Sequence, residues 1–347
     1  MKTIDLRSDT LTLPTSEMLQ VMLQAPLGDD GRAKGTKGED PSAVSAEEFA
    51  ATLMRREDAL FVPSGTLGNT LCVLTHCRRG ARVITADNMH LYKAERSVFD
   101  PEIGGMEAVC LPQTGGVYDR TALETELKTG TVGLVCIENS YNFEGGCAIG
   151  KADMDWMIDL CHDYGVPVHL DGARIFNAAQ ALQITPDSLI SRADSVMFCV
   201  SKGLCAPIGS FVCGSAEWVA RARQKRKLLG GQLRQVGMLA AAGEYALRHL
   251  RERLAKDNAR AAALAVGISN CNGIQLYNET CMTNLVLIRL EQGKNAHEWI
   301  ARLAAEEHVL AHYINDETVR FVTYRGITDE DIAQAIVRIQ SFCHRAG

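Results

Sequence analysis

An aspartate and a lysine each stand at the end of a short apolar run near the middle of the chain. Asp171 ends the run 166–171, and Lys202 ends the run 195–202. Short apolar runs of this kind predict buried parallel strands. A lysine amine can condense with the aldehyde of pyridoxal phosphate (PLP), while a carboxylate can keep the pyridine nitrogen protonated, so that the ring accepts electrons from a broken Cα bond. Together with Arg174, these residues favour a PLP site.

The segments around these residues alternate between strand and helix patterns. Further apolar runs predict strands at residues 59–62, 82–85, 106–111 and 132–137. Helices are expected from a capping box that begins at Ser45 and over residues 153–164. Such alternation implies βαβ units and a mostly parallel sheet, whose ligands bind beyond the carboxyl ends of the strands. The sequence therefore predicts an α/β fold that brings Asp171 and Lys202 to one edge of a sheet.

A second, smaller unit is predicted towards the C-terminus. The alanine-rich segment 238–266 has a helical pattern and could carry the chain out of the first sheet. Two strands and two helices are expected beyond it, at residues 284–290, 318–323, 295–307 and 328–343. A chain of 347 residues is long enough for two such units. We expect a large PLP-binding domain over residues 1–245, N-terminal segment included, and a small C-terminal α+β domain over residues 246–347.

The composition of the sequence limits which binding partners and which cellular compartment we expect. The net charge of −6 gives no electrostatic reason to expect a nucleic acid or an acidic membrane as partner. The chain has 12 cysteines but no C-x-x-C pair, so zinc and thioredoxin-like redox sites are not supported, and no residue is assigned to a metal. Free thiols, with neither a signal peptide nor a long apolar segment, predict a cytoplasmic protein.

A candidate phosphate site follows the predicted strand 59–62. Ser64, Gly65 and Thr66 stand where that strand turns into a helix, and the N-terminus of a helix offers backbone N–H groups to a phosphate. The dinucleotide pattern G-x-G-x-x-G and the P-loop pattern are both absent from the sequence. The turn therefore suits the phosphate of PLP better than that of a dinucleotide.

A series of segments along the whole chain resembles a known family. The matching residues are 5–10, 28–30, 38–41, 64–66, 138–139, 169–178, 201–204, 226–231 with 234–235, and 320–323. In this order they are similar to threonine aldolases, PLP-dependent enzymes of fold type I in the beta-eliminating lyase superfamily. The resemblance implies an aspartate aminotransferase-like fold and an amino-acid substrate. It also implies a homo-oligomer, a dimer or a tetramer, whose active sites are shared between subunits.

The resemblance assigns cofactor roles to individual residues. It implies that Lys202 binds the PLP aldehyde covalently, that Asp171 pairs with the pyridine nitrogen and that His90 stacks on the ring. Further contacts with the cofactor are assigned to Gly65 and Thr66 at the phosphate, to Arg234 from a neighbouring subunit, and to Arg174 and Ser201.

The resemblance also assigns residues to the substrate. Ser8, Arg174 and Arg320 would receive the substrate carboxylate, because the planar fork of arginine can bind a carboxylate through two parallel hydrogen bonds. Family members usually have a histidine that contacts the substrate β-hydroxyl, and in this chain that position is Tyr141. Tyr324 replaces a second family histidine, and the segment 28–38 is longer than the family loop and is expected to be mobile.

The tyrosine at position 141 matters because cleavage of the Cα–Cβ bond needs a base for the β-hydroxyl proton. Histidine, with a pKa of about 6.5, suits this task, whereas tyrosine, at about 10, is mostly protonated at neutral pH. Tyr141 could still act if nearby cations lowered its pKa. Otherwise a water or His90 could take the proton, Tyr141 could merely fill the space, or the substitution could mark a changed substrate or reaction.

Three functions are open at this point. The first, which we prefer, is an aldolase that cleaves a β-hydroxy-α-amino acid, such as threonine, allo-threonine or a phenylserine-like analogue, to glycine and an aldehyde. The alternative keeps PLP but breaks another Cα bond, as in an amino-acid racemase or a β-eliminating lyase. The third is a non-catalytic relative that binds PLP or a partner. The presence of Lys202, Asp171 and Arg174 argues against this third function.

Overall fold

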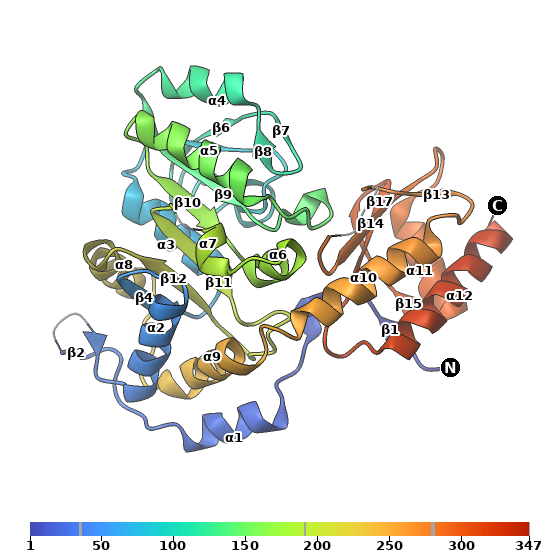
Figure 1. Ribbon diagram of the computed structural model, residues 1–347, viewed down its shortest axis with the longest axis horizontal. Helices are drawn as coiled ribbons and strands as arrows, with labels where there is room; N and C mark the ends of the chain where they lie inside the picture. Colours follow the sequence, from blue (N-terminus) through green and yellow to red (C-terminus); the bar gives the residue numbers. More distant parts are fainter. Residues whose placement is uncertain (35–36, 191, 279–281, 347) are drawn as a thin grey trace.

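A seven-stranded sheet organises the larger part of the molecule (Figure 1). The computed structural model describes residues 1–34, 37–190, 192–278 and 282–346. In the order β4-β12-β11-β10-β9-β5-β6, the strands are β4 (Asp58–Val62), β12 (Ser210–Gly214), β11 (Ser195–Cys199), β10 (Val168–Asp171), β9 (Val132–Glu138), β5 (Arg82–Thr85) and β6 (Glu107–Cys110). Strand β12 runs antiparallel to β4 and β11, and the other neighbours are parallel. The predicted α/β fold with a mostly parallel sheet is confirmed, although β12 was not among the expected strands.

Helices cover both faces of this sheet, because successive side chains of a strand point to opposite faces. Leu60, Met197 and Val212 pack with α3 and α8 on one face. Their neighbours Phe61 and Phe211 belong to the main core, together with alanines of α2 and α9. The helices of this part are α1 (Ser16–Gln24), α2 (Pro41–Leu53), α3 (Gly65–His76), α4 (Arg120–Leu127), α5 (Lys151–Asp163), α6 (Ile175–Leu182), α7 (Pro186–Leu189), α8 (Ala216–Leu228) and α9 (Gly237–His249).

The expected capping box at Ser45 is wrong. Helix α2 begins four residues earlier, at Pro41, and Asp40 caps it by accepting a hydrogen bond from the Ala43 N–H at 3.0 Å. Aspartate is a strong N-cap and proline suits the first helical position, so the pair Asp40-Pro41 starts the helix before Ser45 is reached.

A four-stranded antiparallel sheet forms the C-terminal part. Its order is β13 (Ile274–Leu276), β14 (Leu285–Leu290), β17 (Thr318–Val322) and β16 (His312–Asn315). Helices α10 (Leu254–Ile268), α11 (Ala296–Glu307) and α12 (Asp329–Ala346) pack on it. The expected strands and helices of this part are confirmed, but the helical segment 238–266 is two helices, α9 and α10. Among the described helices, none is long and apolar enough to cross a bilayer.

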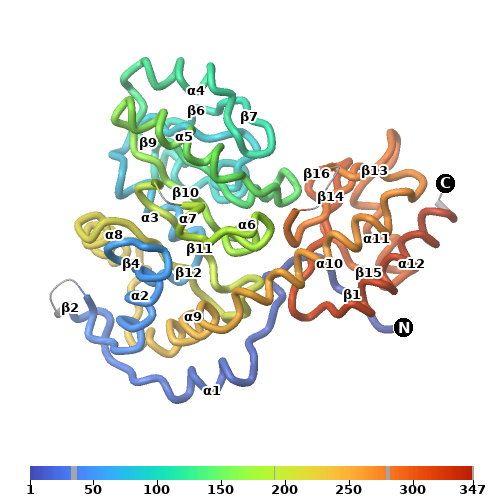
Figure 2. Tube along the Cα trace, in the orientation of Figure 1, coloured from blue at the N-terminus to red at the C-terminus, as the bar shows by residue number. Residues whose placement is uncertain are grey.

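The N-terminal segment packs with this C-terminal sheet, as the tube in Figure 2 shows. Strand β1 (Ile4–Asp5) pairs in parallel with β15 (Val309–Leu310), and Ile4 and Leu6 belong to the C-terminal core. The Leu6 N–H donates to the Leu310 carbonyl oxygen at 2.9 Å. The division at residue 245 stays a prediction, but these contacts join the first residues to the C-terminal sheet rather than to the large one.

The remaining elements are short. The segment 28–38 contains β2 (Ala33–Lys34) and β3 (Lys37–Gly38), which pair antiparallel. Residues 35–36 of the loop expected to be mobile lie outside the described residues. A second short hairpin and three short helical turns complete the fold, namely β7 (Gln113–Thr114), β8 (Val117–Tyr118), η1 (Asp9–Leu11), η2 (Leu91–Glu95) and η3 (Asn142–Glu144).

Replacing Leu6 by alanine is expected to destabilise the protein by about 2–5 kcal/mol, because a fully buried leucine leaves a cavity in the C-terminal core. The matched control is Val337→Ala on α12, where the side chain is 63% exposed and the change should stay within about 0.5 kcal/mol. Urea unfolding measures both. Equal stability of Leu6→Ala and the unchanged protein would contradict the packing of the N-terminal segment.

Candidate active site

Asp171 and Lys202 lie at the carboxyl ends of adjacent parallel strands. Asp171 is the last residue of β10 and pairs in register with Met197 of β11 and Glu138 of β9. Lys202 lies in the turn just after β11. Its ammonium charge acts on the pKa of both Asp9 and His90, so these groups are neighbours at this edge of the sheet.

The Asp171 carboxylate is held by two donors of the same chain. It is 3% exposed, its Oδ1 accepts from the Ala173 N–H at 3.0 Å and its Oδ2 accepts from Asn69 Nδ2 at 2.9 Å. A carboxylate can accept about four hydrogen bonds. Asp171 therefore has capacity left for the protonated nitrogen of a pyridine ring.

The N-terminus of α3 starts at the same edge. Strand β4 runs in the direction of β11, since both are antiparallel to β12, and α3 follows β4. The Ser64 side chain caps the helix through the Leu67 N–H, and the N–H groups of Gly65 and Thr66 stand in the first turn, where a helix supplies no acceptor. A Cβ on Gly65 would lie 2.8 Å from Cys199 Sγ, so this close approach of helix and strand requires glycine. The geometry fits a phosphate.

His90 lies beside Asp171. Its Nδ1 is 3.4 Å from Glu95 Oε1, and the polar atoms of His90, Glu95 and Asp171 all lie within 4.8 Å of one another. Burial alone would lower the pKa of His90, but the hydrogen bond with Glu95 and the charges of Glu138 and Asp171 raise it overall. Three such groups could surround a cation, yet Asn69 Nδ2 already donates to both Glu95 and Asp171. That no residue binds a metal stays a prediction.

Glu138, the last residue of β9, is a further member of the site. Its Oε2 accepts from the His90 N–H and its Oε1 from the Asn142 N–H, both at 2.8 Å. Burial and the charge of Asp171 raise the pKa of Glu138 to about 7, although His90 and the two N–H donors act in the opposite direction. Glu138 thus holds the backbone of the segments that carry His90 and Asn142.

Tyr141 is fully buried, and its hydroxyl donates to Asn88 Oδ1 at 2.7 Å. Burial, followed by the charges of Glu138 and Glu144, raises the pKa of Tyr141 well above its ordinary value. These surroundings are the reverse of the cationic ones that would let tyrosine act as a base. Tyr141 holds Asn88, which lies in the turn that leads to His90.

A buried ion pair joins the N-terminal segment to the residues after β10. Arg174 donates from Nε to Asp9 Oδ2 at 2.7 Å and from Nη2 to Asp9 Oδ1 at 2.8 Å. Burial alone would raise the pKa of Asp9, but Arg174, Lys202 and Asn284 lower it well below its ordinary value. The two-donor fork of Arg174, expected to receive a substrate carboxylate, therefore already holds a carboxylate of the protein.

Arg320 is a cation of this cluster with an unused donor. Its Nη1 donates to Asn142 Oδ1 at 3.1 Å, and the same oxygen accepts from Arg174 Nη1 at 3.3 Å. Its buried Nε has no partner among the described residues. Burial, and then the charge of Arg174, lower the pKa of Arg320 to about 10. A carboxylate placed here would satisfy Nε and relieve the repulsion between the two guanidinium groups.

Three other predicted residues differ in how close they lie to this cluster. Ser8 precedes Asp9 and its Oγ accepts from the Thr10 N–H at 3.2 Å, while Ser201 is half-buried next to Lys202. The Arg234 side chain is 71% exposed and pairs with Asp29 at 3.1 Å. Within one chain the structure therefore places Ser8 and Ser201 beside the site and leaves Arg234 on the surface.

Several polar residues contact the predicted site residues without having been assigned from the sequence. They are Asp9, Asn69, Glu95, Glu138 and Asn142. Asp9 and Glu138 lie in segments that match the family, and Glu138 ends an apolar run just as Asp171 does, so both carried a signal. Glu95 and Asn142 lie outside such runs, and only the folded chain brings them to the site.

Comparison with known proteins agrees with this arrangement. The sequence matches the Beta-eliminating lyase family over residues 5–293. It is 35% identical to low-specificity L-threonine aldolase 1 of Arabidopsis thaliana, over 96% of this chain and 94% of that protein. It is 31% identical to low specificity L-threonine aldolase of Escherichia coli strain K12, over 99% of this chain and 100% of that protein. The chain belongs to the threonine aldolase family of beta-eliminating lyases.

The fold agrees with that family. Threonine aldolase of Leishmania major superposes with a TM-score of 0.80 at 21% identity, covering 98% of this chain and 99% of that one. The expected fold type I architecture is thereby confirmed. Membership of the threonine aldolase family makes the protein a lyase.

Replacing Asp9 by asparagine is expected to destabilise the protein by about 3–5 kcal/mol, because Arg174 would be left buried without a counter-charge. The matched control is Asp5→Asn, which removes a more exposed ion pair with Arg7 and should cost no more than about 1 kcal/mol. Urea unfolding at neutral pH compares the two. A smaller loss for Asp9→Asn than for Asp5→Asn would contradict the proposed importance of the buried pair.

The lowered pKa of Asp9 determines how the stability of the protein changes at low pH. Its pKa in the folded protein lies below the unfolded value of about 3.9, so its contribution is present above that pH and is lost as the pH falls. We expect the free energy of unfolding to fall more steeply below about pH 4 in the unchanged protein than in Asp9→Asn. Parallel profiles, measured by urea unfolding at each pH, would contradict this expectation.

Proposed function

We propose that the protein cleaves a β-hydroxy-α-amino acid between Cα and Cβ, to give glycine and an aldehyde, with PLP as its cofactor. The observation that carries the proposal is Arg320, a half-buried cation whose buried Nε is unpaired among the described residues, near the edge that holds Lys202 and Asp171. An amino-acid carboxylate is an anion that can accept a charge-assisted hydrogen bond from such a donor. The relatives are named low-specificity L-threonine aldolases, so threonine, allo-threonine and phenylserine-like analogues are the proposed substrates.

The residues at the strand ends suit PLP. Lys202 would take the aldehyde, Asp171 the ring nitrogen, and the first-turn N–H groups of Gly65 and Thr66 the phosphate. When bound, PLP supplies an electron sink for the pair released as the Cα–Cβ bond breaks. Two observations support a fit between these residues and PLP. The close approach of α3 to β11 requires glycine at position 65, and the Asp171 carboxylate can accept further hydrogen bonds.

Arg320 and Asn142 would orient the substrate. The carboxylate would bind Arg320 through the Nε that has no partner, and Asn142 would keep the two guanidinium groups in place through its shared oxygen. Arg174 would act through its charge, because its fork is committed to Asp9. A carboxylate held at this point directs the Cα–Cβ bond relative to the groups at the strand ends.

His90 is the proposed acceptor of the β-hydroxyl proton. Its Nδ1 faces Glu95, which leaves Nε2 to accept a proton, and the carboxylate stabilises the imidazolium that forms. Tyr141 is assigned to positioning instead, since its raised pKa keeps the proton on the hydroxyl that binds Asn88. The same observation argues against the alternative of a racemase that uses Tyr141 to move the Cα proton.

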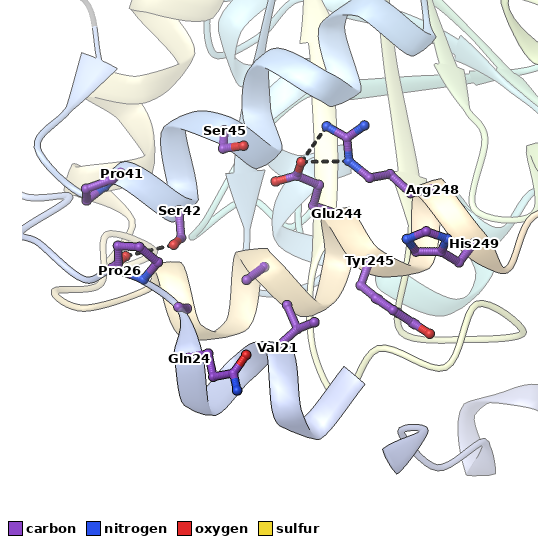
Figure 3. Close-up of a pocket in the computed structure, with 12 residues that line it drawn as sticks. Val21, Gln24, Pro26, Pro41, Ser42, Ser45, Glu244, Tyr245, Arg248 and His249 are labelled. Atoms are coloured by element: carbon purple, nitrogen blue, oxygen red, sulfur yellow. Dashed lines mark hydrogen bonds and ion pairs between the residues drawn. The ribbon is translucent and has the colours of Figure 1, made fainter. Parts of the chain in front are cut away.

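A second copy of this chain is the proposed partner, with active sites shared between subunits. Large apolar side chains are exposed on and near α1, among them Leu13 at 75% and Leu23 at 83%. A cavity of about 440 Å³ lies between α1, α2 and α9, and Figure 3 shows Val21 and Tyr245 among its lining residues. Arg234 is exposed and could reach a neighbouring phosphate site.

Free cysteines throughout the described residues support the proposed cytoplasmic location.

The reaction is tested on PLP-loaded protein by proton NMR in deuterated water with L-threonine, L-allo-threonine, L-phenylserine and L-alanine. We expect glycine and an aldehyde from the β-hydroxy substrates, and no such product after Lys202→Ala. Loss of the Cα proton with the carbon skeleton intact would favour the racemase. Borohydride reduction that leaves no pyridoxyl group on Lys202 would favour the non-catalytic relative.

The assignment of the base is tested by Tyr141→Phe and His90→Gln. Tyr141→Phe removes one hydrogen bond and should lower kcat by no more than about tenfold. His90→Gln removes the proton acceptor and should lower kcat by about 10²- to 10⁴-fold. Steady-state kinetics over a range of pH measures both. A larger loss for Tyr141→Phe, with the disappearance of a limb of the pH profile, would make Tyr141 the base.

A further inference from the structure

A chain of hydrogen bonds runs from Asp171 into the interior of the protein. Asn69 Nδ2 donates to Asp171 Oδ2 at 2.9 Å, and Asn69 Oδ1 lies 3.1 Å from His169 Nε2. The other ring nitrogen of His169, Nδ1, lies 3.0 Å from Ser195 Oγ, and that oxygen lies 2.9 Å from Nε2 of His76. Asn69, His169 and Ser195 are fully buried. None of the roles assigned above uses His169, Ser195 or His76.

The elements of the large sheet bring these residues into line. His169 and Asp171 lie two residues apart on β10 and so point to the same face, and Ser195 of β11 pairs in register with His169. Asn69 and His76 lie two turns apart on α3, which packs on these strands and spans about 10 Å between the two residues. The chain of hydrogen bonds therefore leads from the carboxyl end of β10 to the start of β11.

The outer end of the chain reaches the surface. His76 is half-buried and lines a cavity of about 490 Å³, together with Arg56, Asp194 and Trp218. Burial lowers the pKa of both His76 and His169 to about 4, so each ring is neutral at pH 7 and carries one N–H. The hydrogen-bonded groups from His76 to Asn69 are therefore all uncharged, and only the Asp171 carboxylate at the end carries a charge.

Neutral rings allow one arrangement of protons that satisfies all four contacts. Asn69 donates to Asp171 through Nδ2, so its Oδ1 accepts, and His169 must carry its proton on Nε2. Nδ1 of His169 then accepts the hydroxyl proton of Ser195, whose oxygen accepts from Nε2–H of His76. Every donor in the chain points towards Asp171.

We propose that His76, Ser195 and His169 are positioning residues that keep the Asn69 amide turned with its NH₂ group towards Asp171, and so hold that carboxylate for the cofactor ring. The proposal rests on the proposed function, because it takes Asp171 as the partner of the pyridine nitrogen. The NH₂ group of Asn69 also donates to Glu95, and a rotation of the amide by half a turn would direct its oxygen at both carboxylates. Here such a rotation would also direct NH₂ at the Nε2–H of His169, unless the protons of His169, Ser195 and His76 were all rearranged with it.

The first test reads the tautomers directly, without any reaction. Long-range proton–nitrogen NMR of PLP-loaded protein with ¹⁵N-labelled histidine is expected to show both His76 and His169 neutral and protonated on Nε2 at pH 7. His76→Gln and His169→Gln variants assign the two signals. A proton on Nδ1 of His169 would overturn the proposal, whatever the substrate of the enzyme proves to be.

The second test removes the middle of the chain. Ser195→Ala takes away the donor to His169 and is expected to change the absorption spectrum of the bound cofactor and to lower kcat about three- to tenfold, with KM unchanged. Ser195→Thr keeps the hydroxyl and should restore both readouts. The matched control is Thr75→Val, which removes a buried hydroxyl that donates to the Leu71 carbonyl oxygen within α3 and should leave the spectrum unchanged.

His76, at the outer end of the hydrogen-bond chain, can be replaced without changing any of the fully buried residues. His76→Leu removes the N–H donor and should shift the cofactor spectrum in the same direction as Ser195→Ala, whereas His76→Gln keeps an N–H and should not. Unchanged spectra in both Ser195→Ala and His76→Leu would overturn the proposal. If the unchanged enzyme cleaves no β-hydroxy amino acid, the proposed function fails, but the spectra and the tautomers still decide whether the chain positions Asp171.

Discussion

The buried ion pair between Asp9 and Arg174 is the contact on which the site depends most. Neither charge is compatible with the interior alone, because an unpaired buried ion is destabilising by several kcal/mol. Asp9 follows the strand that pairs with β15 and also accepts a hydrogen bond from Asn284, the residue before β14. Arg174 lies just beyond the end of β10. One carboxylate therefore joins the C-terminal sheet to the end of the large sheet, and it brings Arg320 of β17 close to Arg174 despite their like charges.

The same pair helps to separate the site into a positive and a negative side. One side carries the positive charges of Lys202, Arg174 and Arg320. The Asp9 carboxylate lies among them and interacts with these charges. Asp171, Glu138 and Glu95 surround His90 on the other side, and their charges raise its pKa. An amino acid bound through its carboxylate faces the first side, and a protonated ring nitrogen faces the second. The order of charge along the site thus matches the order of charge in the proposed complex.

The parts of this arrangement that follow from local pattern could be predicted from the sequence. Apolar runs that end in Asp171 and Lys202 predicted two strands whose carboxyl ends lie at one edge of a sheet, and in the structure these strands are neighbours. The start of α2 was missed because a cap at Asp40 competes with the pattern at Ser45. The pairing of Asp9 with Arg174 could not be predicted at all, since it depends on how the N-terminal segment crosses to the C-terminal sheet. Neither could the surroundings of Tyr141, because no pattern places Glu138 or Glu144 beside the tyrosine.

Those surroundings explain why a tyrosine suits position 141. A histidine placed beside Glu138 and Glu144 would be driven towards its protonated form, and the hydrogen bond to Asn88 would then change with pH. Burial and the same carboxylates raise the pKa of the tyrosine hydroxyl, so it remains a donor to Asn88 throughout the physiological range. The turn that leads to His90 is thus held by a group that does not titrate. The pH dependence of this side of the site then falls to His90 and Glu138. The hydrogen bond with Glu95 and the charges of Glu138 and Asp171 raise the pKa of His90, and burial and the charge of Asp171 raise the pKa of Glu138.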